Sequence, residues 1–282
     1  MKLNLFVSCW GNEVDITGAL VLAKSWQADG IEGAVPSDEP NQEALLHRSV
    51  PWITEIATGG GYVPHPHLTP QQHLDDLRRS IEAALPFKPI MFNTLAGRDA
   101  WSFADKVKFH AAALPLEQEF GIPIAFETHR SRPTFHPWVT RDLLLELPEL
   151  HLTCDFSHWC TVTERLVMDE EAELLDLVSS RARHIHARVG YDQGPQVPDP
   201  RAPEYADAVE AHVRWWQHIL KTQATMGRTS FTFTPEFGPD GYLQSEPFTR
   251  KPAADLREVN HWMLRPLRDV ITADCSSYNF WK

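Results

Sequence analysis

Residues 122–155 read IPIAFETHRSRPTFHPWVTRDLLLELPELHLTCD, with one helical segment between two short apolar segments. The apolar segments, residues 122–127 and 151–155, have the length and composition of buried strands. Between them, residues 140–147 (TRDLLLEL) have the leucine spacing of an amphipathic helix. A strand, a crossover helix and a second strand form a parallel β-α-β unit, which is typical of α/β folds.

The same strand–helix unit recurs along the whole chain, eight times in all. The expected strands cover residues 3–9, 30–35, 52–58, 89–94, 122–127, 151–155, 184–189 and 229–236, and the expected helices cover residues 15–28, 41–48, 70–84, 100–120, 140–147, 169–180, 205–226 and 252–270. Eight units in unbroken alternation favour a closed (β/α)8 TIM barrel over an open sheet. No linker or low-complexity segment divides the chain, so we expect a single domain over residues 1–282.

The composition is that of a globular protein rather than a disordered one, with 43% hydrophobic and 23% charged residues. The 38 acidic and 26 basic side chains give a net charge of −12, which argues against a nucleic-acid partner. No apolar run reaches the roughly 18–20 residues of a membrane span, and the start has no signal-peptide core. The four cysteines (Cys9, Cys154, Cys160 and Cys275) have no CxxC spacing, so we expect a reduced, cytoplasmic protein without a membrane partner.

Each of the last four expected strands ends in a side chain that can bind a metal ion or move a proton. These side chains are Glu127, Asp155, His186 and Glu236. Side chains alternate between the two faces of a strand, so sequence parity tells which neighbours share a face. In all four strands the candidate shares its face with small or polar residues, namely Ala125, Thr153, His184, Arg188, Ser230, Thr232 and Thr234, while bulky apolar residues occupy the other face. Because barrel active sites lie at the C-terminal strand ends, we expect the four side chains to meet there.

Three carboxylates and one imidazole make an oxygen-rich ligand set for one divalent metal ion. Such a set suits Mn²⁺, Mg²⁺ or Co²⁺, and also accepts Fe²⁺ or, less selectively, Zn²⁺. Without a cation, three clustered carboxylates would repel one another, and at least one would have to stay protonated. A single glutamate after an apolar run is usually a solvated strand end, but four such residues on consecutive strands favour a site. His184 stays open as the ligand in place of His186, since it shares that face one layer deeper.

Around these residues the sequence resembles the xylose isomerase-like TIM-barrel family, which includes sugar isomerases and epimerases, inosose dehydratase and endonuclease IV. The motifs that carry the resemblance are Phe126-Glu127-Thr128-His129, Asp155-Phe156-Ser157-His158, His184-Ile185-His186-Ala187-Arg188 and Pro235-Glu236-Phe237-Gly238. The resemblance implies that Glu127, Asp155, His186 and Glu236 hold one divalent cation and that Glu127 and Glu236 are the acid–base pair. It also implies that His158 and Arg188 hold substrate oxygens and that His129 lies near the substrate.

The activity implied by the resemblance is that of a metal-dependent isomerase or epimerase acting on a small sugar. The metal would bind adjacent oxygens of the sugar, and one glutamate would remove the proton between them to give a metal-bound enediolate. Return of a proton to the neighbouring carbon isomerises the sugar, and return to the opposite face epimerises it. Arg188 and His158 would stabilise the developing negative oxygen.

Three other functions stay open at this point. The same enolate chemistry can expel a β-substituent, which would make the protein a lyase or dehydratase acting on a keto-sugar or an inosose. An endonuclease IV-like phosphodiesterase needs three metals, but the third expected strand leads into Thr58-Gly59-Gly60-Gly61 and Arg188 follows His186 where further ligands are needed. His65 and His67 lie farther along the chain and are expected at the surface. A non-catalytic binding protein on the same scaffold is the fourth reading.

Several further residues are candidates for the rim of the barrel mouth. Trp10, at the end of the first expected strand, would form an apolar wall for a sugar ring. Glu55 lies in the middle of a strand and is expected to form an outward salt bridge, and Val35-Pro36 stands where an acidic residue often ends strand two in the family. In the long loop after residue 189, Gln193 and Gln196 offer amides suited to sugar hydroxyls.

The carboxyl-terminal residues Tyr278-Asn279-Phe280-Trp281 are apolar for a chain end. We expect them to dock on their own barrel or on a second copy in a homo-oligomer. No glycine-rich phosphate cradle follows the last two expected strands, which favours an unphosphorylated sugar.

Overall fold

Eight parallel strands follow one another around a closed barrel, each hydrogen-bonded to the next strand in the sequence and β8 to β1. The structure is a computed structural model that describes residues 1–239 and 241–270. The strands are β1 (Lys2–Ser8), β2 (Gly30–Gly33), β3 (Trp52–Ala57), β4 (Met91–Leu95), β5 (Ile124–Glu127), β6 (Leu152–Cys154), β7 (Ala182–Ala187) and β8 (Ser230–Pro235). The predicted (β/α)8 barrel is therefore confirmed.

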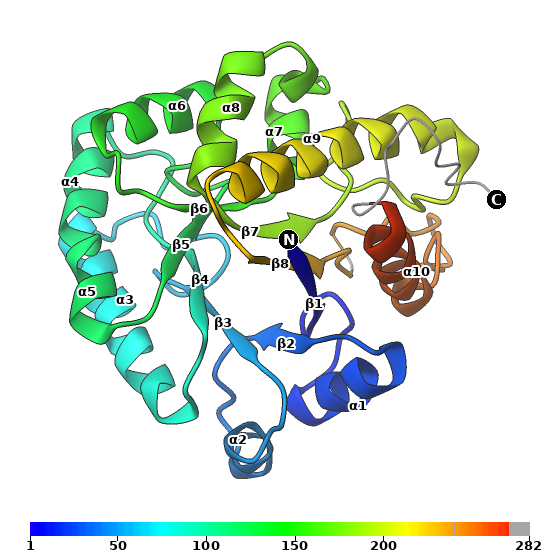
Figure 1. The fold of residues 1–282 in the computed structure, drawn as a ribbon, viewed down its shortest axis with the longest axis horizontal. Helices are drawn as coiled ribbons and strands as arrows, with labels where there is room; N and C mark the ends of the chain where they lie inside the picture. Colours follow the sequence, from blue (N-terminus) through cyan, green and yellow to red (C-terminus); the bar gives the residue numbers. More distant parts are fainter. Residues whose placement is uncertain (240, 271–282) are drawn as a thin grey trace.

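Helices connect the strands and form the outer layer around the barrel (Figure 1). They are α1 (Ile16–Trp26), α2 (Glu39–Leu46), α3 (Pro70–Ala84), α4 (Phe103–Ala113), α5 (Pro115–Phe120), α6 (Pro137–Glu146), α7 (Ser157–Thr163), α8 (Ala172–Arg181), α9 (Ala206–Thr225) and α10 (Leu256–Val270). Short 3₁₀ helices cover Leu85–Phe87, Val167–Asp169 and Pro203–Tyr205.

Two helical regions differ from the expectation. The single helix expected over residues 100–120 is divided into α4 and α5, because Pro115 lacks the backbone N–H that a continuous helix needs. The short helix α7, directly after β6, was not predicted, since a segment of seven residues is too short for a clear helical period. The other expected helices are present, with ends that differ by a few residues from the expectation. Helix α3 begins with a capping box formed by Thr69 and Gln72.

The last four strands carry their bulky apolar side chains on the outer face, as parity predicts. Ile124, Phe126 and Ile185 are buried in the apolar layer between the strands and the helices. Inside the barrel, Phe6, Ile53, Met91 and Ala125 form a small apolar cluster near the starts of β3 and β4. Toward the C-terminal strand ends the interior becomes polar. The charged side chains therefore lie closer to the C-terminal mouth of the barrel than this apolar cluster does.

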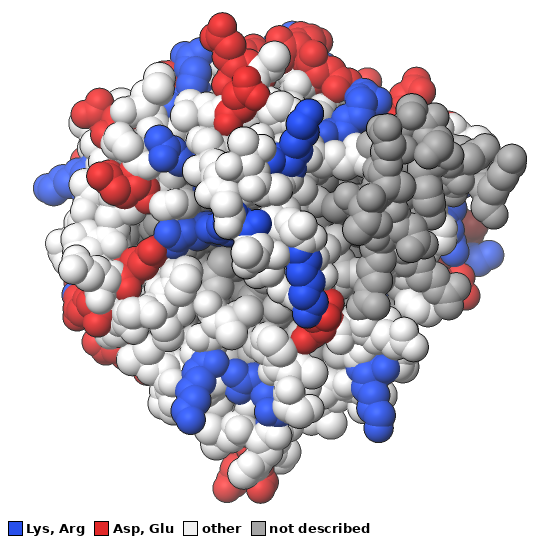
Figure 2. All heavy atoms as spheres, viewed as in Figure 1, with Lys and Arg blue, Asp and Glu red and all other residues white. Residues whose placement is uncertain are grey.

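The described part of the chain contains no helix with both the length and the apolar character needed to cross a bilayer. On the face of the molecule where the N-terminus lies, basic and acidic side chains are interspersed (Figure 2). Cys275 and the tail expected to dock, residues 278–281, lie outside the described residues.

Candidate active site

The side chains of Glu127, Asp155, His186 and Glu236 meet at the C-terminal mouth of the barrel. One ligand atom from each residue lies within 4.8 Å of the ligand atoms of the other three. Glu127 ends β5 and His186 lies on β7, while Asp155 and Glu236 directly follow β6 and β8. All four residues are buried, so the structure brings together the complete set expected from the strand ends.

One ring nitrogen of His186, Nδ1, faces the carboxylates of this cluster. Its Nδ1 lies 2.9 Å from Oε2 of Glu236 and 3.5 Å from Oε2 of Glu127. Despite these distances, Nδ1 makes no hydrogen bond of good geometry with any described residue. A buried imidazole nitrogen without a hydrogen bond, surrounded by carboxylate oxygens, is the arrangement that a divalent cation satisfies. The residues present therefore fit a metal ion.

Asp155 is held in place by its neighbours on both oxygens. Its Oδ1 accepts hydrogen bonds from the backbone N–H of Ser157 (3.0 Å) and from the Ser157 hydroxyl (2.5 Å). Its Oδ2 forms an ion pair with the guanidinium of Arg188, which also lies 3.8 Å from Glu236. The start of α7 thus orients one candidate ligand, and Arg188 balances part of the negative charge of the cluster.

The two glutamates of the expected acid–base pair have different pKa values. Burial is the largest influence on Glu236 and raises its pKa to about 7, with the nearby Glu127 carboxylate also raising it. Burial acts in the same direction on Glu127, but the charge of His186 and the hydrogen bond from the amide of Asn93 outweigh it, and the pKa falls to about 2. Asn93 donates to Oε2 of Glu127 at 2.9 Å. At neutral pH one glutamate is ionised and the other exchanges its proton readily.

A cavity of about 210 Å³ opens above these carboxylates. It is lined by Trp10, Glu55, Tyr62, Leu95, Glu127, His129, Arg188, Glu236 and Tyr242. Five of these residues, Trp10, Glu127, His129, Arg188 and Glu236, are candidates that the sequence singled out. The small volume suits a small molecule, because drug-sized ligands occupy roughly 300–1,000 Å³.

Aromatic rings form the walls of this cavity. The ring of Trp10 lies 5.2 Å from that of Tyr242, edge to face, and 6.0 Å from that of Tyr62. The guanidinium carbon of Arg188 lies 4.4 Å from the centre of the Tyr242 ring, a cation–π contact that fixes both side chains. A flat aromatic surface beside polar groups is suited to the apolar face of a sugar ring.

Arg132 fixes the loop that carries Tyr62. Its buried guanidinium donates hydrogen bonds to the carbonyl oxygens of Thr58 (2.9 Å), Gly97 (3.0 Å) and Tyr62 (3.0 Å), and also to that of Gly61. The loops after β3 and β4 are thereby tied together at the rim of the cavity. Nothing in the local sequence around Arg132 indicated this role, since the carbonyls that it binds come from distant segments.

Glu55 corrects one expectation. Instead of forming an outward salt bridge, it is buried, lines the cavity and is hydrogen-bonded to Tyr62. Burial and the neighbouring Glu236 carboxylate raise the pKa of Glu55 to about 8. Parity could have identified it, because Glu55 shares the inward face of β3 with Ile53.

Glu32 corrects a second expectation, that the region of strand two lacks an acidic residue. The strand ends at Gly33 rather than near Val35, and the fully buried Glu32 points into the barrel toward His184 and His186. Burial alone would raise its pKa, but the two imidazoles lower the pKa of Glu32 below its ordinary value. The signal in the sequence was an acid inside an otherwise apolar strand.

The remaining polar candidates lie around the cavity with different roles. His158 is fully buried and accepts a hydrogen bond at Nε2 from Nη2 of Arg188 (2.9 Å), so it lies behind Arg188 and is absent from the described cavity lining. His129 faces the cavity, and its Nε2 lies 3.3 Å from the Tyr242 hydroxyl. Gln196 is not free for sugar hydroxyls, because its amide exchanges two hydrogen bonds with the backbone of Gly238.

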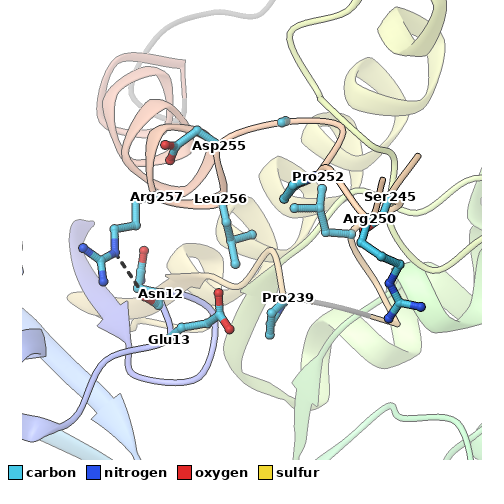
Figure 3. Close-up of a pocket in the computed structure, with 11 residues that line it drawn as sticks. Asn12, Glu13, Pro239, Ser245, Arg250, Pro252, Asp255, Leu256 and Arg257 are labelled. Carbon is cyan, nitrogen blue, oxygen red and sulfur yellow. Dashed lines mark hydrogen bonds between the residues drawn. The ribbon is translucent and has the colours of Figure 1, made fainter. Parts of the chain in front are cut away.

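A second and larger cavity, of about 630 Å³, lies beside the mouth (Figure 3). It is bounded by the loop after β1, by the segment after β8 and by the start of α10, where Nε of Arg257 donates to the carbonyl oxygen of Asn12 at 3.3 Å. Its lining includes Glu13, Arg250 and Asp255 but none of the four clustered ligand residues. Of these two cavities, only the smaller one is lined by members of the candidate metal-binding cluster.

Comparison with known proteins identifies the fold. No protein-family model and no curated protein matches the sequence. Among solved structures, the IolI protein with a bound zinc atom matches with a TM-score of 0.61 and 12% identity, covering 95% of this chain and 98% of that chain. A D-tagatose 3-epimerase-like protein matches with a TM-score of 0.59 and 13% identity, covering 95% and 98%.

A third solved structure is the probable 3-DHS dehydratase AsbF from Bacillus anthracis. It matches with a TM-score of 0.59 and 13% identity, covering 94% of this chain and 98% of that chain. The three matches show a shared fold, and this fold is the one that the resemblance to the xylose isomerase-like TIM-barrel family implies. At such low identities the activity has to be inferred from the site itself.

Proposed function

We propose that this protein is a divalent-metal-dependent isomerase or epimerase that moves a proton beside the carbonyl group of a small sugar. One observation carries the proposal: the ligand atoms of Glu127, Asp155, His186 and Glu236 cluster within 4.8 Å of one another at the mouth of the barrel. Two of these residues also line the adjoining cavity. The zinc atom bound to the structurally similar IolI protein supports a divalent ion on this scaffold.

The four clustered residues would hold the metal ion. When bound, the ion supplies positive charge to two neighbouring oxygens of the sugar, which makes the intervening C–H more acidic. Glu127 then acts as the base, since its carboxylate is ionised and faces the cavity. Glu236, which also lines the cavity, would return a proton to the substrate.

Arg188 and the aromatic walls bind and orient the substrate. Arg188 lines the cavity and carries a fixed positive charge, so it stabilises negative charge that develops on a substrate oxygen. Trp10 and Tyr242 provide the surface on which the sugar ring rests and exclude water from it. Because no glycine-rich phosphate cradle follows the last two strands, we propose an unphosphorylated sugar.

Mass and isotope analysis test the proposal directly. The protein is loaded with Mn²⁺ and incubated in heavy water with a panel of aldoses, ketoses and keto-sugars, and the products are examined by NMR and mass spectrometry. We expect deuterium uptake at the carbon beside the carbonyl with no other change in mass. Absence of exchange with every sugar, although Mn²⁺ is bound, would contradict the proposal.

A dehydratase is the second candidate, and one observation favours it. Glu55 is a third carboxyl group in the cavity, with a pKa of about 8, so it carries a proton at neutral pH. A protonated carboxyl could donate that proton to a leaving hydroxyl group after Glu127 has removed the proton beside the carbonyl. In the same experiment a dehydratase would give a product lighter than its substrate by one water.

A three-metal phosphodiesterase fits the site poorly. The lone pair of His158 Nε2, which a second cation would need, already accepts a hydrogen bond from Arg188. His65 and His67, after β3, are exposed and do not line the described cavity. The positive charge of Arg188 next to Asp155 further disfavours a second cation in this position.

A further inference from the structure

A buried polar layer lies directly beneath the four clustered residues, deeper in the barrel. Its centre is Glu32, which is fully buried and reaches two histidines of β7 with its two oxygens. Oε1 lies 2.9 Å from Nε2 of His186, and Oε2 lies 3.1 Å from Nε2 of His184. The hydroxyl of Thr234 donates to the same Oε2 at 2.5 Å. Neither the acid–base pair nor the substrate cavity uses this layer.

The contact with Glu32 determines which nitrogen of His186 carries the hydrogen. An ionised carboxylate can only accept hydrogen bonds, so the 2.9 Å contact requires a hydrogen on Nε2 of His186. In the neutral ring the lone pair then lies on Nδ1, the nitrogen that faces Glu127 and Glu236 and has no hydrogen bond with a described residue.

A contact with Asn93 favours the opposite position of the hydrogen on His186, but it is weaker than the contact with Glu32. Its amide nitrogen lies 3.3 Å from Nε2 of His186, and donation along this line would place the hydrogen on Nδ1 instead. The contact with Glu32 is 0.4 Å shorter (3.3 − 2.9) and is assisted by charge, which makes such hydrogen bonds roughly twice as strong as neutral ones. The amide of Asn93 also has a closer acceptor in Glu127, at 2.9 Å.

We propose that Glu32 is a positioning residue that keeps the hydrogen of His186 on Nε2 and so presents Nδ1 as the ligand for the divalent ion. The inference rests on the metal centre proposed above and adds a residue that does not touch the ion. A carboxylate on the far side of a ligating imidazole fixes the orientation of the ring and increases its basicity, and loss of such a partner typically weakens metal binding 10–100-fold.

Binding of Mn²⁺ alone to the full chain tests this role, with free Mn²⁺ measured by EPR. We expect Glu32→Leu to raise the Kd about 10–100-fold. Glu32→Gln should recover most of the affinity, because its amide oxygen still accepts from Nε2 of His186 while the amide NH₂ group meets His184 and Thr234. The recovery distinguishes positioning from a general need for a well-packed barrel interior.

Thr232→Val is the matched control. The Thr232 hydroxyl lies 2.8 Å from Nδ1 of His184, so the substitution removes a hydrogen bond from the same layer without changing the contact between Glu32 and His186. We expect its affinity for Mn²⁺ to stay within about threefold of that of the wild type, a change of less than ~0.7 kcal/mol.

The nitrogen NMR spectrum of the Zn²⁺-loaded protein gives a readout that a purely structural role would not move. In the wild type we expect His186 to coordinate through Nδ1 and to carry a hydrogen on Nε2, with the signal assigned from a His186→Asn variant. In Glu32→Leu the two nitrogens should exchange roles in part of the molecules, or the coordination shift should disappear.

The outcomes separate this inference from the proposed function. If the wild type does not bind Mn²⁺, the metal centre and the role of Glu32 both fall. If the wild type binds Mn²⁺ but folded Glu32→Leu binds it equally well, only the role of Glu32 is overturned. Coordination of Zn²⁺ by His184 in the wild type would also overturn it, because Glu32, His184 and His186 would then form the metal site themselves.

Discussion

The indole ring of Trp10 lies directly on the backbone of Gly238. A β-carbon on residue 238 would come within 1.9 Å of the ring, so the wall of the cavity depends on glycine at this position. The backbone of Gly238 is itself held by the amide of Gln196, with bonds of 2.7 and 3.1 Å. Two segments distant in the sequence thus fix the place of one aromatic side chain.

Gly238→Ala should therefore weaken substrate binding more than metal binding. The added methyl group displaces Trp10, and we expect KM to rise about tenfold, equivalent to ~1.4 kcal/mol. The Kd for Mn²⁺ should stay unchanged, because the ligand atoms come from other side chains. Steady-state kinetics of Gly238→Ala beside Trp10→Ala check this, since both should show the same effect. An unchanged KM in both variants would mean that Trp10 does not contact the substrate.

The two glutamates of the acid–base pair should each be essential for turnover. In Glu127→Gln and Glu236→Gln the proton can no longer be taken or returned, and we expect kcat to fall at least ~100-fold. Turnover is measured on samples with equal Mn²⁺ content, which separates lost proton transfer from lost metal. Near-normal turnover in either variant would remove that residue from the mechanism.

Arg132→Met should destabilise the protein and loosen the rim of the cavity. The substitution leaves four backbone carbonyls without their donor, and we expect a loss of ~2–4 kcal/mol in the free energy of unfolding. Arg78→Met is the control, because the pair of Arg78 with Glu119 is exposed and such surface ion pairs contribute little to stability. Urea unfolding measures both. Equal stability of the two variants would refute the structural importance of Arg132.

Buried histidines should make the protein acid-sensitive at pH values above the ordinary pKa of a carboxylate. Burial lowers the pKa of His110 from 6.5 to about 4, so between these values the unfolded chain binds a proton that the folded chain does not. Stability is complete above pH 6.5 and falls as the pH decreases toward 4. For this residue the loss at pH 5 is ~2 kcal/mol.

His110→Gln should reduce that loss, as measured by urea unfolding at pH 7 and pH 5. Phe109→Leu, a substitution of the neighbouring apolar residue, should lower stability equally at both pH values. If His110→Gln leaves the pH dependence of unfolding unchanged, the acid sensitivity arises elsewhere.

Divalent ions should stabilise the folded state if the four clustered residues bind them. At a free Mn²⁺ concentration of about 100 times Kd, binding adds ~2.7 kcal/mol to the free energy of unfolding. The rise in Tm should vanish after treatment with a chelator and should be absent in Asp155→Asn combined with His186→Asn. A rise in Tm that persists in the double variant would place the bound ion elsewhere.

The alternation of apolar and helical segments was sufficient to predict the barrel. Parity along the last four strands then identified which side chains face inward, and Glu127 and Glu236 are found where it put them. These signals work because strand direction and side-chain alternation are set locally by the backbone.

The missed features depend on contacts between distant segments. Glu32 meets His184 and His186 across 152 and 154 residues, and Arg132 binds carbonyls more than 30 residues away. The end of β2 at Gly33 also shifted the position at which an acidic residue was sought. Local patterns carry no information about which distant segment will supply a partner.

The candidate ligand residues and the aromatic cavity walls come from different segments, which has a practical consequence for engineering. The clustered ligand residues come from β5 to β8 and the residues directly after them, whereas Trp10, Tyr62 and Tyr242 come from the segments after β1, β3 and β8. A combinatorial library confined to these three aromatic positions would change which molecules enter the barrel while keeping all four clustered ligand residues. Selectivity in this scaffold can therefore be evolved separately from reactivity.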